Sequence, residues 1–353
     1  MVAAGAGLAV GAGRGESGGA ATDPAPEEAA GLPLRVQVGQ LVVSSFDGTR
    51  LPEYLRRRLR RRQTAGVILF GDNVAAKSSL GRLLRKTQRA AGRGALVMTD
   101  QEGGAIRIVG FAGPAPAQPG QGSPRRVRRL ARTAAHQLRS VGVNVVLAPV
   151  ADLPAGAALR GRTFEGSSGA VAARVRASVE GWRGGLVAAT AKHFPGLGAA
   201  GLNTDDHSVT IRLSRRRLER HLRPFRAALS EGVPLVMASH ARFPAYDRHR
   251  IASQSRALLT GLLRGWLGYD GVIVTDSIEA QAVVGGSSVG VAAERSIAAG
   301  ADVVLCTGSA SWKLIYPRLL RRARRSPAFR RRVEESAARV LRLKRRLKLR
   351  APG

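Results

Sequence analysis

The prediction of the fold depends on residues 186–210, which read LVAATAKHFPGLGAAGLNTDDHSVT. Residues 186–191 are apolar except for one threonine, which predicts a short buried strand. Lys192 and His193 follow where that strand ends, and Pro195 begins a turn that interrupts regular structure. The loop beyond the turn is polar. Cationic, carboxylate and imidazole groups therefore gather at the end of a strand, where binding and catalytic residues concentrate.

Eight apolar runs of this kind recur along the chain, each followed by a polar or glycine-containing loop and an arginine-rich amphipathic segment. Because the runs are continuous rather than alternating, they are typical of parallel strands covered on both faces. Eight strand–helix units predict an α/β protein with a single (β/α)8 TIM-type barrel. A doubly wound open sheet is the alternative that periodicity does not separate from it. The predicted strands are 38–45, 66–70, 95–99, 143–149, 186–191, 234–239, 271–275 and 301–306.

The segments between these runs have the amphipathic pattern of helices, and one more such segment closes the chain. We expect residues 34–350 to form the barrel as one domain, since a chain of this length can bury one large core. The predicted helices are 51–62, 78–91, 124–141, 170–182, 214–232, 256–267, 288–299 and 328–349.

Residues 1–33 differ in composition, being rich in glycine and alanine and then in proline and acidic residues. Such a segment cannot bury enough apolar surface to fold, so we expect a disordered tail. Residues 3–12 faintly resemble the apolar region of a secretory signal, although no basic residue precedes them. A signal remnant and a plain tail are both compatible with this segment. The expected location is accordingly either exported, in the cell envelope, or cytoplasmic.

The chain of 353 residues carries a formal net charge of +33, which favours anionic partners such as cell-wall polymers. Specific recognition of nucleic acid is not expected, because reading motifs are absent and aromatic residues make up only 4%. No apolar run in the sequence is long enough to span a membrane. Cys306 is the only cysteine and lies in an apolar run, which excludes an intrachain disulfide and a cysteine metal cluster.

A barrel predicts that functional groups follow the carboxyl ends of several strands, and five predicted strands meet this expectation. A phosphate-binding glycine loop, a metal-binding helix and a nucleophilic serine elbow are absent from the sequence, so we expect no cofactor and no metal. Carboxylates, a histidine and cations on one rim suit retaining glycoside cleavage, in which one group attacks the anomeric carbon and another transfers the proton. The residues on the rim are Asp100, Asp152, Lys192 with His193, His240 and Asp276.

Residues 192–198 read KHFPGLG and are followed by Asp205-x-His207, and together these motifs resemble the signature of glycoside hydrolase family 3. More narrowly, they are similar to the β-N-acetylhexosaminidase branch of that family. The resemblance covers roughly residues 36–310. Further segments that agree in order and spacing are 100–104, 148–152, 161–164, 237–240 and 274–277.

The resemblance implies a role for each matching residue. Asp276 would be the nucleophile that forms a covalent glycosyl-enzyme. His207, oriented by Asp205, would be the general acid and base in place of a second carboxylate, and imidazole suits this role because it titrates near neutral pH. The residues that would hold the hydroxyl groups of the sugar are Asp100, Arg162, Lys192, His193 and His240.

We therefore expect a monomeric retaining exo-β-glycosidase, most specifically a β-N-acetylglucosaminidase. Its carbohydrate substrate would be peptidoglycan fragments, as in peptidoglycan recycling, or chitin-type oligosaccharides. Two departures from the family pattern keep alternatives open. Leu197 stands where the pattern has a histidine, and two extra residues separate Gly198 from the Asp-x-His motif. The alternatives are a family-3 barrel that prefers another β-glycoside and a catalytically decayed barrel that binds sugar or cell wall.

Overall fold

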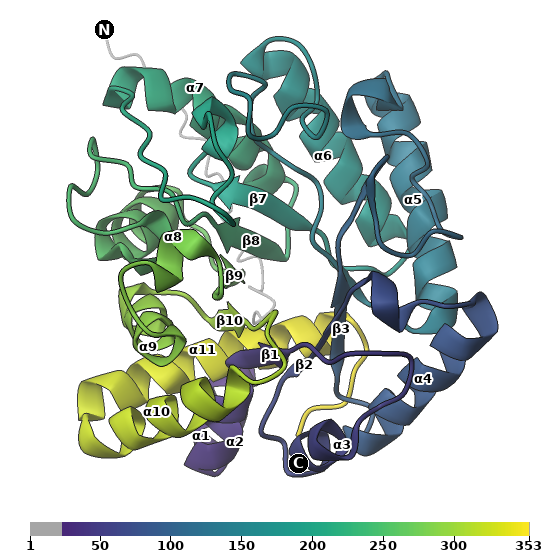
Figure 1. Cartoon of the computed structure of the whole chain (residues 1–353), viewed down its shortest axis with the longest axis vertical. Coiled ribbons are helices and arrows are strands. Elements are labelled where there is room, and N and C mark those ends of the chain that lie inside the picture. The colour runs from purple at the N-terminus through teal and green to yellow at the C-terminus, as the bar shows by residue number, and fades with distance from the viewer. Residues whose placement is uncertain (1–22, 353) are drawn as a thin grey trace, which may run out of the picture.

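The structure is a computed structural model that describes residues 23–352 of the chain. Eight parallel strands form one sheet in the order β6-β3-β2-β1-β10-β9-β8-β7, with helices around it (Figure 1). The first and last strands of this order also approach each other, because parallel bridges join Val145 to Ala188 and Val150 to Lys192. The sheet is therefore nearly closed. This confirms the predicted (β/α)8 barrel and makes the open-sheet alternative wrong.

Each of the eight predicted apolar runs overlaps one strand of the barrel, and β7 and β9 extend beyond the predicted ends to Phe194 and Ser277. The strand β7 begins later than predicted, because Leu186 has a φ of 59° and belongs to the turn that follows the preceding helix. A short antiparallel pair, β4 (Gln101–Gly103) and β5 (Ile106–Arg107), comes directly after β3. The barrel strands are β1 Val42–Ser44, β2 Gly66–Leu69, β3 Leu96–Thr99, β6 Val145–Val146, β7 Thr190–Phe194, β8 Leu235–Ala238, β9 Val272–Ser277 and β10 Val303–Leu305.

Four of the helices have a serine N-cap, whose hydroxyl oxygen accepts a hydrogen bond from a backbone N–H of the first turn. These serines are Ser123, Ser167, Ser214 and Ser326, which precede α5, α6, α7 and α11. The α-helices are α1 Ala25–Gly31, α2 Leu34–Gly39, α3 Glu53–Arg60, α4 Lys77–Ala90, α5 Pro124–Val141, α6 Ser168–Gly184, α7 Arg215–Ser230, α8 Gln281–Val284, α9 Val289–Ala299, α10 Trp312–Arg325 and α11 Pro327–Arg346. The segment η5 (Ala257–Trp266) is a π-helix. The short 3-10 helices are η1 Gly71–Asn73, η2 Gln118–Gln121, η3 Leu197–Ala199 and η4 Ala252–Gln254.

Every second strand residue contributes to the interior of the barrel, because successive side chains of a strand point to opposite faces. The inward set packs in one cluster with Val340 and Leu343 of α11 and with Leu347 just after it. Helix α11 crosses behind the strands in Figure 1 and closes the amino-terminal end. The outward set packs against the surrounding helices, so both faces are apolar and the runs are continuous. The inward residues include Leu96, Met98, Val145, Leu147, Leu235, Met237, Val272, Val274, Val303 and Leu305.

The amino-terminal segment is part of this closed end. Helix α1 packs against α11, and the carboxylate of Asp23 lies 2.8 Å from the guanidinium of Arg345. The prediction that residues 1–33 are disordered is therefore wrong for residues 25–31, whereas residues 1–22 lie outside the described residues. Composition failed here because small alanines and acidic side chains find an arginine-rich helix only in the tertiary structure.

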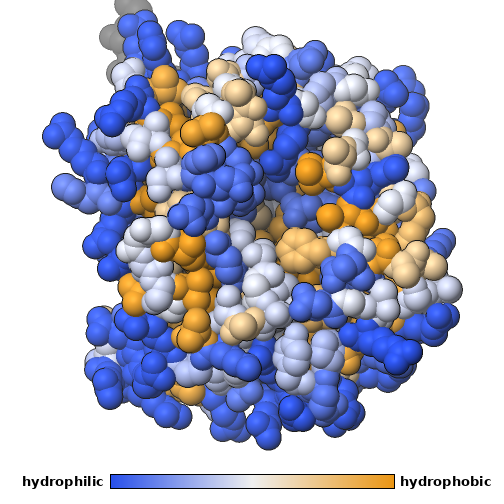
Figure 2. All heavy atoms as spheres, in the orientation of Figure 1, coloured by the Kyte–Doolittle hydropathy of each residue, from blue (hydrophilic) through white to orange (hydrophobic). Residues whose placement is uncertain are grey.

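Hydrophilic side chains cover most of the outline of the molecule in Figure 2, as the net charge of +33 leads one to expect. Apolar residues are visible between them, and a hollow lies near the middle of this face. Within residues 23–352, no helix combines the length and the apolarity needed to cross a membrane.

A buried lysine near the closed end makes stability depend on pH. Lys344 of α11 is 3% exposed and donates a hydrogen bond to Oε1 of Gln40 at 2.7 Å. Burial lowers the pKa of Lys344 from 10.5 to about 7. Unfolding therefore takes up a proton between those two pH values, so this group lowers stability below about pH 7 and ceases to do so as the pH rises towards 10.

We expect Lys344→Met to raise the free energy of unfolding relative to the parent chain near pH 6, and to lose that advantage near pH 10. Urea unfolding of both proteins at the two pH values measures the difference. Lys86→Met, which changes an exposed lysine of α4, is the control and should show no such trend. A stability difference for Lys344→Met that stays constant with pH would contradict the burial of a largely neutral amine.

Candidate active site

The inward columns of the barrel change from apolar to polar at the carboxyl ends of the strands. In β9, Val272 and Val274 face the interior, and Asp276 is the next residue of the same column. The same step of two residues leads from Met98 to Asp100 at the end of β3. The alternation that builds the apolar core therefore also places carboxylates over its open end.

A cluster of four charged side chains joins three elements at this end. Nζ of Lys192 lies 2.5 Å from Oδ1 of Asp100 and 2.7 Å from Oε1 of Glu102. Arg162, in the loop before α6, donates two hydrogen bonds to the same carboxylate of Glu102, from Nε at 2.9 Å and from Nη2 at 2.7 Å. The cluster ties the ends of β3 and β7 to that loop, with Glu102 at its centre.

Opposite charges in this cluster keep one another ionised although Glu102 and Lys192 are buried. Burial alone would raise the pKa of Glu102, but Lys192 and Arg162 outweigh it and lower the pKa to about 2. Burial lowers the pKa of Lys192, while the carboxylates of Asp100 and Glu102 raise it to a net value above the ordinary one. Glu102 and Lys192 are thus a buried ion pair. Asp100 and Arg162 are 24% and 26% exposed, so they can offer charge-assisted hydrogen bonds to a polar ligand.

Asp276 stands apart from this cluster as an ionised carboxylate. Its side chain is 19% exposed, and its Oδ1 accepts a hydrogen bond from the N–H of Ser277 at 2.8 Å. Burial would raise the pKa of Asp276, but the neighbouring His193 and Lys192 lower it below the ordinary value. The result is an accessible, negatively charged oxygen at the end of β9, which is what a nucleophile requires.

A second buried carboxylate, Asp152, fixes the histidine that faces Asp276. Oδ2 of Asp152 accepts hydrogen bonds from the backbone N–H of His193 at 2.9 Å and from its Nδ1 at 2.8 Å. Oδ1 accepts from the N–H of Leu197 at 2.6 Å. Nε2 of His193 then lies 3.9 Å from Oδ2 of Asp276. Asp152 therefore orients the imidazole and the turn that follows β7.

His240 lies deeper than the sequence prediction placed it. Its side chain is fully buried, with Nδ1 at 2.7 Å from Oγ of Ser253 and Nε2 at 2.8 Å from the carbonyl oxygen of Ser277. Burial lowers the pKa of His240, so the ring is neutral, and Nε2 donates its proton to that carbonyl. With both nitrogens engaged, His240 supports the backbone beside Asp276 instead of facing a sugar directly.

The loop after β7 carries Asp205 and His207. The carbonyl of Asp205 accepts a hydrogen bond from the N–H of Gln281 at 2.8 Å, which fastens the loop to the start of α8. The carboxylate of Asp205 accepts from Nδ2 of Asn203 at 3.1 Å, and desolvation and the charge of Asp276 raise its pKa. His207 is exposed, and no hydrogen bond joins it to Asp205 among the contacts of the described residues. The structure brings Asp205 into electrostatic range of Asp276 but leaves His207 at the surface.

Two residues of the site carry roles that sequence reasoning missed. Glu102 was recognised only as part of the motif at 100–104, yet it binds both Lys192 and Arg162. Asp152 was recognised on the rim without a partner, and it holds His193. The signal for both was an acidic residue close to a predicted strand end, but the sequence did not indicate which cation each would meet.

The donor atoms of the site are engaged with cations rather than gathered around an open space for a metal. Within residues 23–352, no group of three or more His, Cys, Asp or Glu side chains is arranged to hold a metal ion. The two carboxylates closest to Lys192 already form ion pairs with it. The chemistry available to the site is therefore that of carboxylates, imidazoles and fixed positive charges.

Glu102→Gln should destabilise the chain because Lys192 and Arg162 would lose their shared buried carboxylate. We expect the free energy of unfolding to fall by about 3–5 kcal/mol at neutral pH, the usual cost of removing one partner of a buried pair. Because the pKa of Glu102 falls from 4.5 to about 2 on folding, its contribution is fully present above about pH 4.5 and is lost as the pH falls towards 2.

Denaturant unfolding of parent and variant near pH 7 and near pH 3 measures this trend. Glu180→Gln is the matched control, since it breaks an exposed pair with Arg128 and should cost less than about 1 kcal/mol. An equal loss in the two variants at neutral pH would show that burial of the Glu102 pair is not what matters.

The family model described as the glycosyl hydrolase family 3 N terminal domain matches residues 33–343. An uncharacterized secreted glycosyl hydrolase of Arthroderma benhamiae is 34% identical over 293 residues, which are 78% of this chain and 83% of the relative. A β-hexosaminidase of Xanthomonas oryzae pv. oryzae is 33% identical over 270 residues, which are 73% of this chain and 80% of the relative.

Solved structures of glycoside hydrolases also resemble this chain. A glycoside hydrolase family 3 β-N-acetylglucosaminidase from Paenibacillus sp. superposes with a TM-score of 0.85 at 32% identity, covering 91% of this chain and 64% of that chain. A β-N-acetylhexosaminidase from Beutenbergia cavernae gives a TM-score of 0.83 at 29% identity, covering 89% of this chain and 99% of that chain. The resemblance seen in the sequence is confirmed, and the chain belongs to glycoside hydrolase family 3.

Proposed function

We propose that this chain is a retaining exo-β-glycosidase, and specifically a β-N-acetylglucosaminidase of peptidoglycan fragments or chitin-type oligosaccharides. The observation that carries the proposal is the ionised, partly exposed carboxylate of Asp276 within electrostatic range of Lys192 and Arg162. The preference for an N-acetylated sugar is supported by the relatives, which are named as β-hexosaminidase, β-N-acetylhexosaminidase and β-N-acetylglucosaminidase.

The proposed reaction has two steps that both occur at the anomeric carbon. In the first, a carboxylate oxygen of Asp276 forms a bond to that carbon, the bond to the aglycone oxygen breaks, and protonated His207 gives that oxygen its proton. In the second, neutral His207 takes a proton from water, the water oxygen bonds to the anomeric carbon, and the bond to Asp276 breaks. Two inversions restore the β-configuration, while Asp100 and Arg162 hold sugar hydroxyls.

The proton donor requires a change in the loop that carries it. His207 is exposed, so its imidazole must turn towards Asp276 when the sugar binds. The carboxylate of Asp205 already lies in electrostatic range of Asp276 and would exchange its bond to Asn203 for one to His207. In this proposal, Asp205 fixes the tautomer of the imidazole and Asp152 with His193 supports the opposite side of Asp276.

Asp276→Asn should lower the rate of hydrolysis of para-nitrophenyl β-N-acetylglucosaminide by roughly a thousandfold or more, because an amide cannot form the glycosyl-enzyme. Asp270→Asn is the control, since Asp270 is exposed and precedes the amino-terminal end of the same strand. NMR of the first product should detect the β-anomer. Release of the α-anomer would refute a covalent intermediate on Asp276, and faster turnover of the β-glucoside would transfer the assignment to that sugar.

His207→Ala should slow substrates with poor leaving groups far more than activated aryl glycosides, because only poor leaving groups need the proton. The ratio of kcat/KM for a chitin-type disaccharide to that for the aryl glycoside measures the effect, and we expect it to fall by roughly a hundredfold. His136→Ala, on the outer helix α5, is the control. An unchanged ratio would assign the proton transfer to another group, such as Asp205.

A second candidate function is a catalytically decayed barrel that binds sugar or cell wall. The exposed position of His207 favours it, and so does Leu197, whose side chain is buried in the core where the family pattern has a histidine. Binding of N-acetylglucosamine oligosaccharides without turnover at any pH would support this candidate. Turnover that disappears in Asp276→Asn would exclude it.

We also propose an anionic cell-wall polymer as a partner of the basic surface, because a net charge of +33 attracts polyanions. The chain is proposed to act as a monomer, which light scattering of the purified protein measures. Fractionation of cells that produce the full chain distinguishes an exported or cell-envelope location from a cytoplasmic one.

A further inference from the structure

A cavity of about 520 Å³ opens between η5, the turn after α9 and the start of α11. It lies at the amino-terminal end of the barrel, because the neighbouring Asp302 precedes β10 and contacts Ile273 at the start of β9. Asp276 is at the opposite end of β9. Glu335 is the one carboxylate that lines the cavity, against six arginines. These are Arg256, Arg264, Arg322, Arg331, Arg332 and Arg339.

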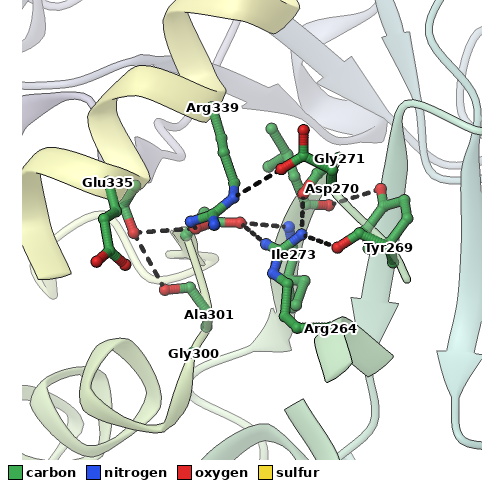
Figure 3. A network of polar contacts seen from close by, with 12 residues as sticks. Arg264, Tyr269, Asp270, Gly271, Ile273, Gly300, Ala301, Glu335 and Arg339 are labelled. Atoms are coloured by element: carbon green, nitrogen blue, oxygen red, sulfur yellow. Dashed lines mark hydrogen bonds and ion pairs between the residues drawn. The ribbon is translucent and has the colours of Figure 1, made fainter. Parts of the chain in front are cut away.

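Three of the arginines have a structural partner in Asp302, whose side chain is fully buried. Its Oδ1 lies 2.7 Å from Nη2 of Arg332 and 3.4 Å from Nη1 of Arg339, and its Oδ2 pairs with Arg264. Burial would raise the pKa of Asp302, but these guanidinium groups lower it below the ordinary value. Figure 3 shows Arg264 and Arg339 reaching this network from η5 and α11. One carboxylate thus serves three cations.

The other arginines have weaker compensation. Arg256 and Arg331 are exposed and form no ion pair within residues 23–352. Nε of Arg322 lies 3.6 Å from Glu294, whose carboxylate also pairs with Arg318 at 2.7 Å. The positive side chains around the cavity therefore exceed the carboxylates that could balance them.

The start of α11 adds a further positive contribution. Ser326 caps this helix of 20 residues, and both Ser326 and Ala328 line the cavity. The first turn of α11 contains no acidic side chain, so nothing there offsets the positive end of the helix dipole. The positive end of a helix dipole favours a bound anion, and guanidinium groups bind phosphate through charge-assisted hydrogen bonds.

We propose that this cavity binds a phosphate-bearing ligand with at least two negative charges. Arg256 and Arg331 would each form two parallel hydrogen bonds to phosphate oxygens, which is the geometry that guanidinium and phosphate share. Asp302 holds Arg332 and Arg339 in place beneath them, so part of the site is already ordered before the ligand arrives. The ligand would relieve the repulsion between like charges that the cavity otherwise contains.

The site is independent of glycoside hydrolysis, because it lies at the end of the barrel opposite Asp276. Its ligand is either a soluble diphosphate compound or a segment of a polymer that carries phosphate groups. These sources share one chemistry, and they differ in whether a short anion suffices for saturable binding.

The test is calorimetric titration of the full chain with inorganic pyrophosphate and, separately, with long-chain polyphosphate. Arg256→Gln/Arg331→Gln removes two cations at the cavity, and Arg82→Gln/Arg85→Gln removes two exposed cations from α4 as the matched control. Both double variants should keep the thermal midpoint and the glycosidase rate of the parent, since none of these residues forms an ion pair within residues 23–352 or belongs to the active site.

We expect pyrophosphate to bind the parent chain saturably at one site. Its dissociation constant should rise roughly tenfold or more in the cavity variant and less than about twofold in the control. If pyrophosphate does not bind measurably but the cavity variant alone binds polyphosphate more weakly, the site is still supported. Its ligand is then a polymer. If both double variants lose the same amount of affinity for both anions, the proposal is overturned in favour of nonspecific attraction by the basic surface. Absence of saturable binding of either anion would overturn it as well.

Discussion

Eight parallel strands around a nearly closed barrel must all end at one rim, and this geometry explains where the charged side chains gather. Because each strand is buried on both faces, the residues towards its amino-terminal end are mostly apolar, and charged side chains appear where a column leaves the core. Asp100 and Asp276 are such residues. The proposed active site is therefore the polar continuation of the packing that stabilises the barrel.

Charge compensation then decides how each end of the barrel is built. The chain has 57 lysines and arginines but only 24 aspartates and glutamates, and two buried carboxylates, Glu102 and Asp302, each bind several cations. At the open end, Glu102 serves Lys192 and Arg162, and at the closed end Asp302 serves three arginines. A buried charge without a partner is costly, which makes these carboxylates structural centres. Arg256 and Arg331 form no ion pair within residues 23–352, so they can face solvent or a ligand.

Much of the architecture could be predicted because the spacing of apolar residues along the chain indicates each helix and strand. Helix α5 has the predicted bounds, 124–141, since a serine precedes an amphipathic run that a glycine ends. Helix α1 was missed because its stability comes from α11, at the other end of the chain. The late start of β7 was missed because an apolar run does not reveal that Leu186 belongs to a turn.

Local patterns along the chain are enough to predict the eight strand–helix units, the residues that end the strands, and the motifs that identify the family. Those features depend on neighbours within a few positions, so a pattern of two or of about 3.6 residues carries them. Three features became known only from the folded chain: the sheet nearly closes, Asp152 orients His193 across 41 positions, and His240 is buried against the backbone beside Asp276. The fold also leaves Asp205 hydrogen-bonded to Asn203, with no hydrogen bond to His207 among the described residues. Which carboxylate meets which cation depends on distances in space, and no local pattern contains them.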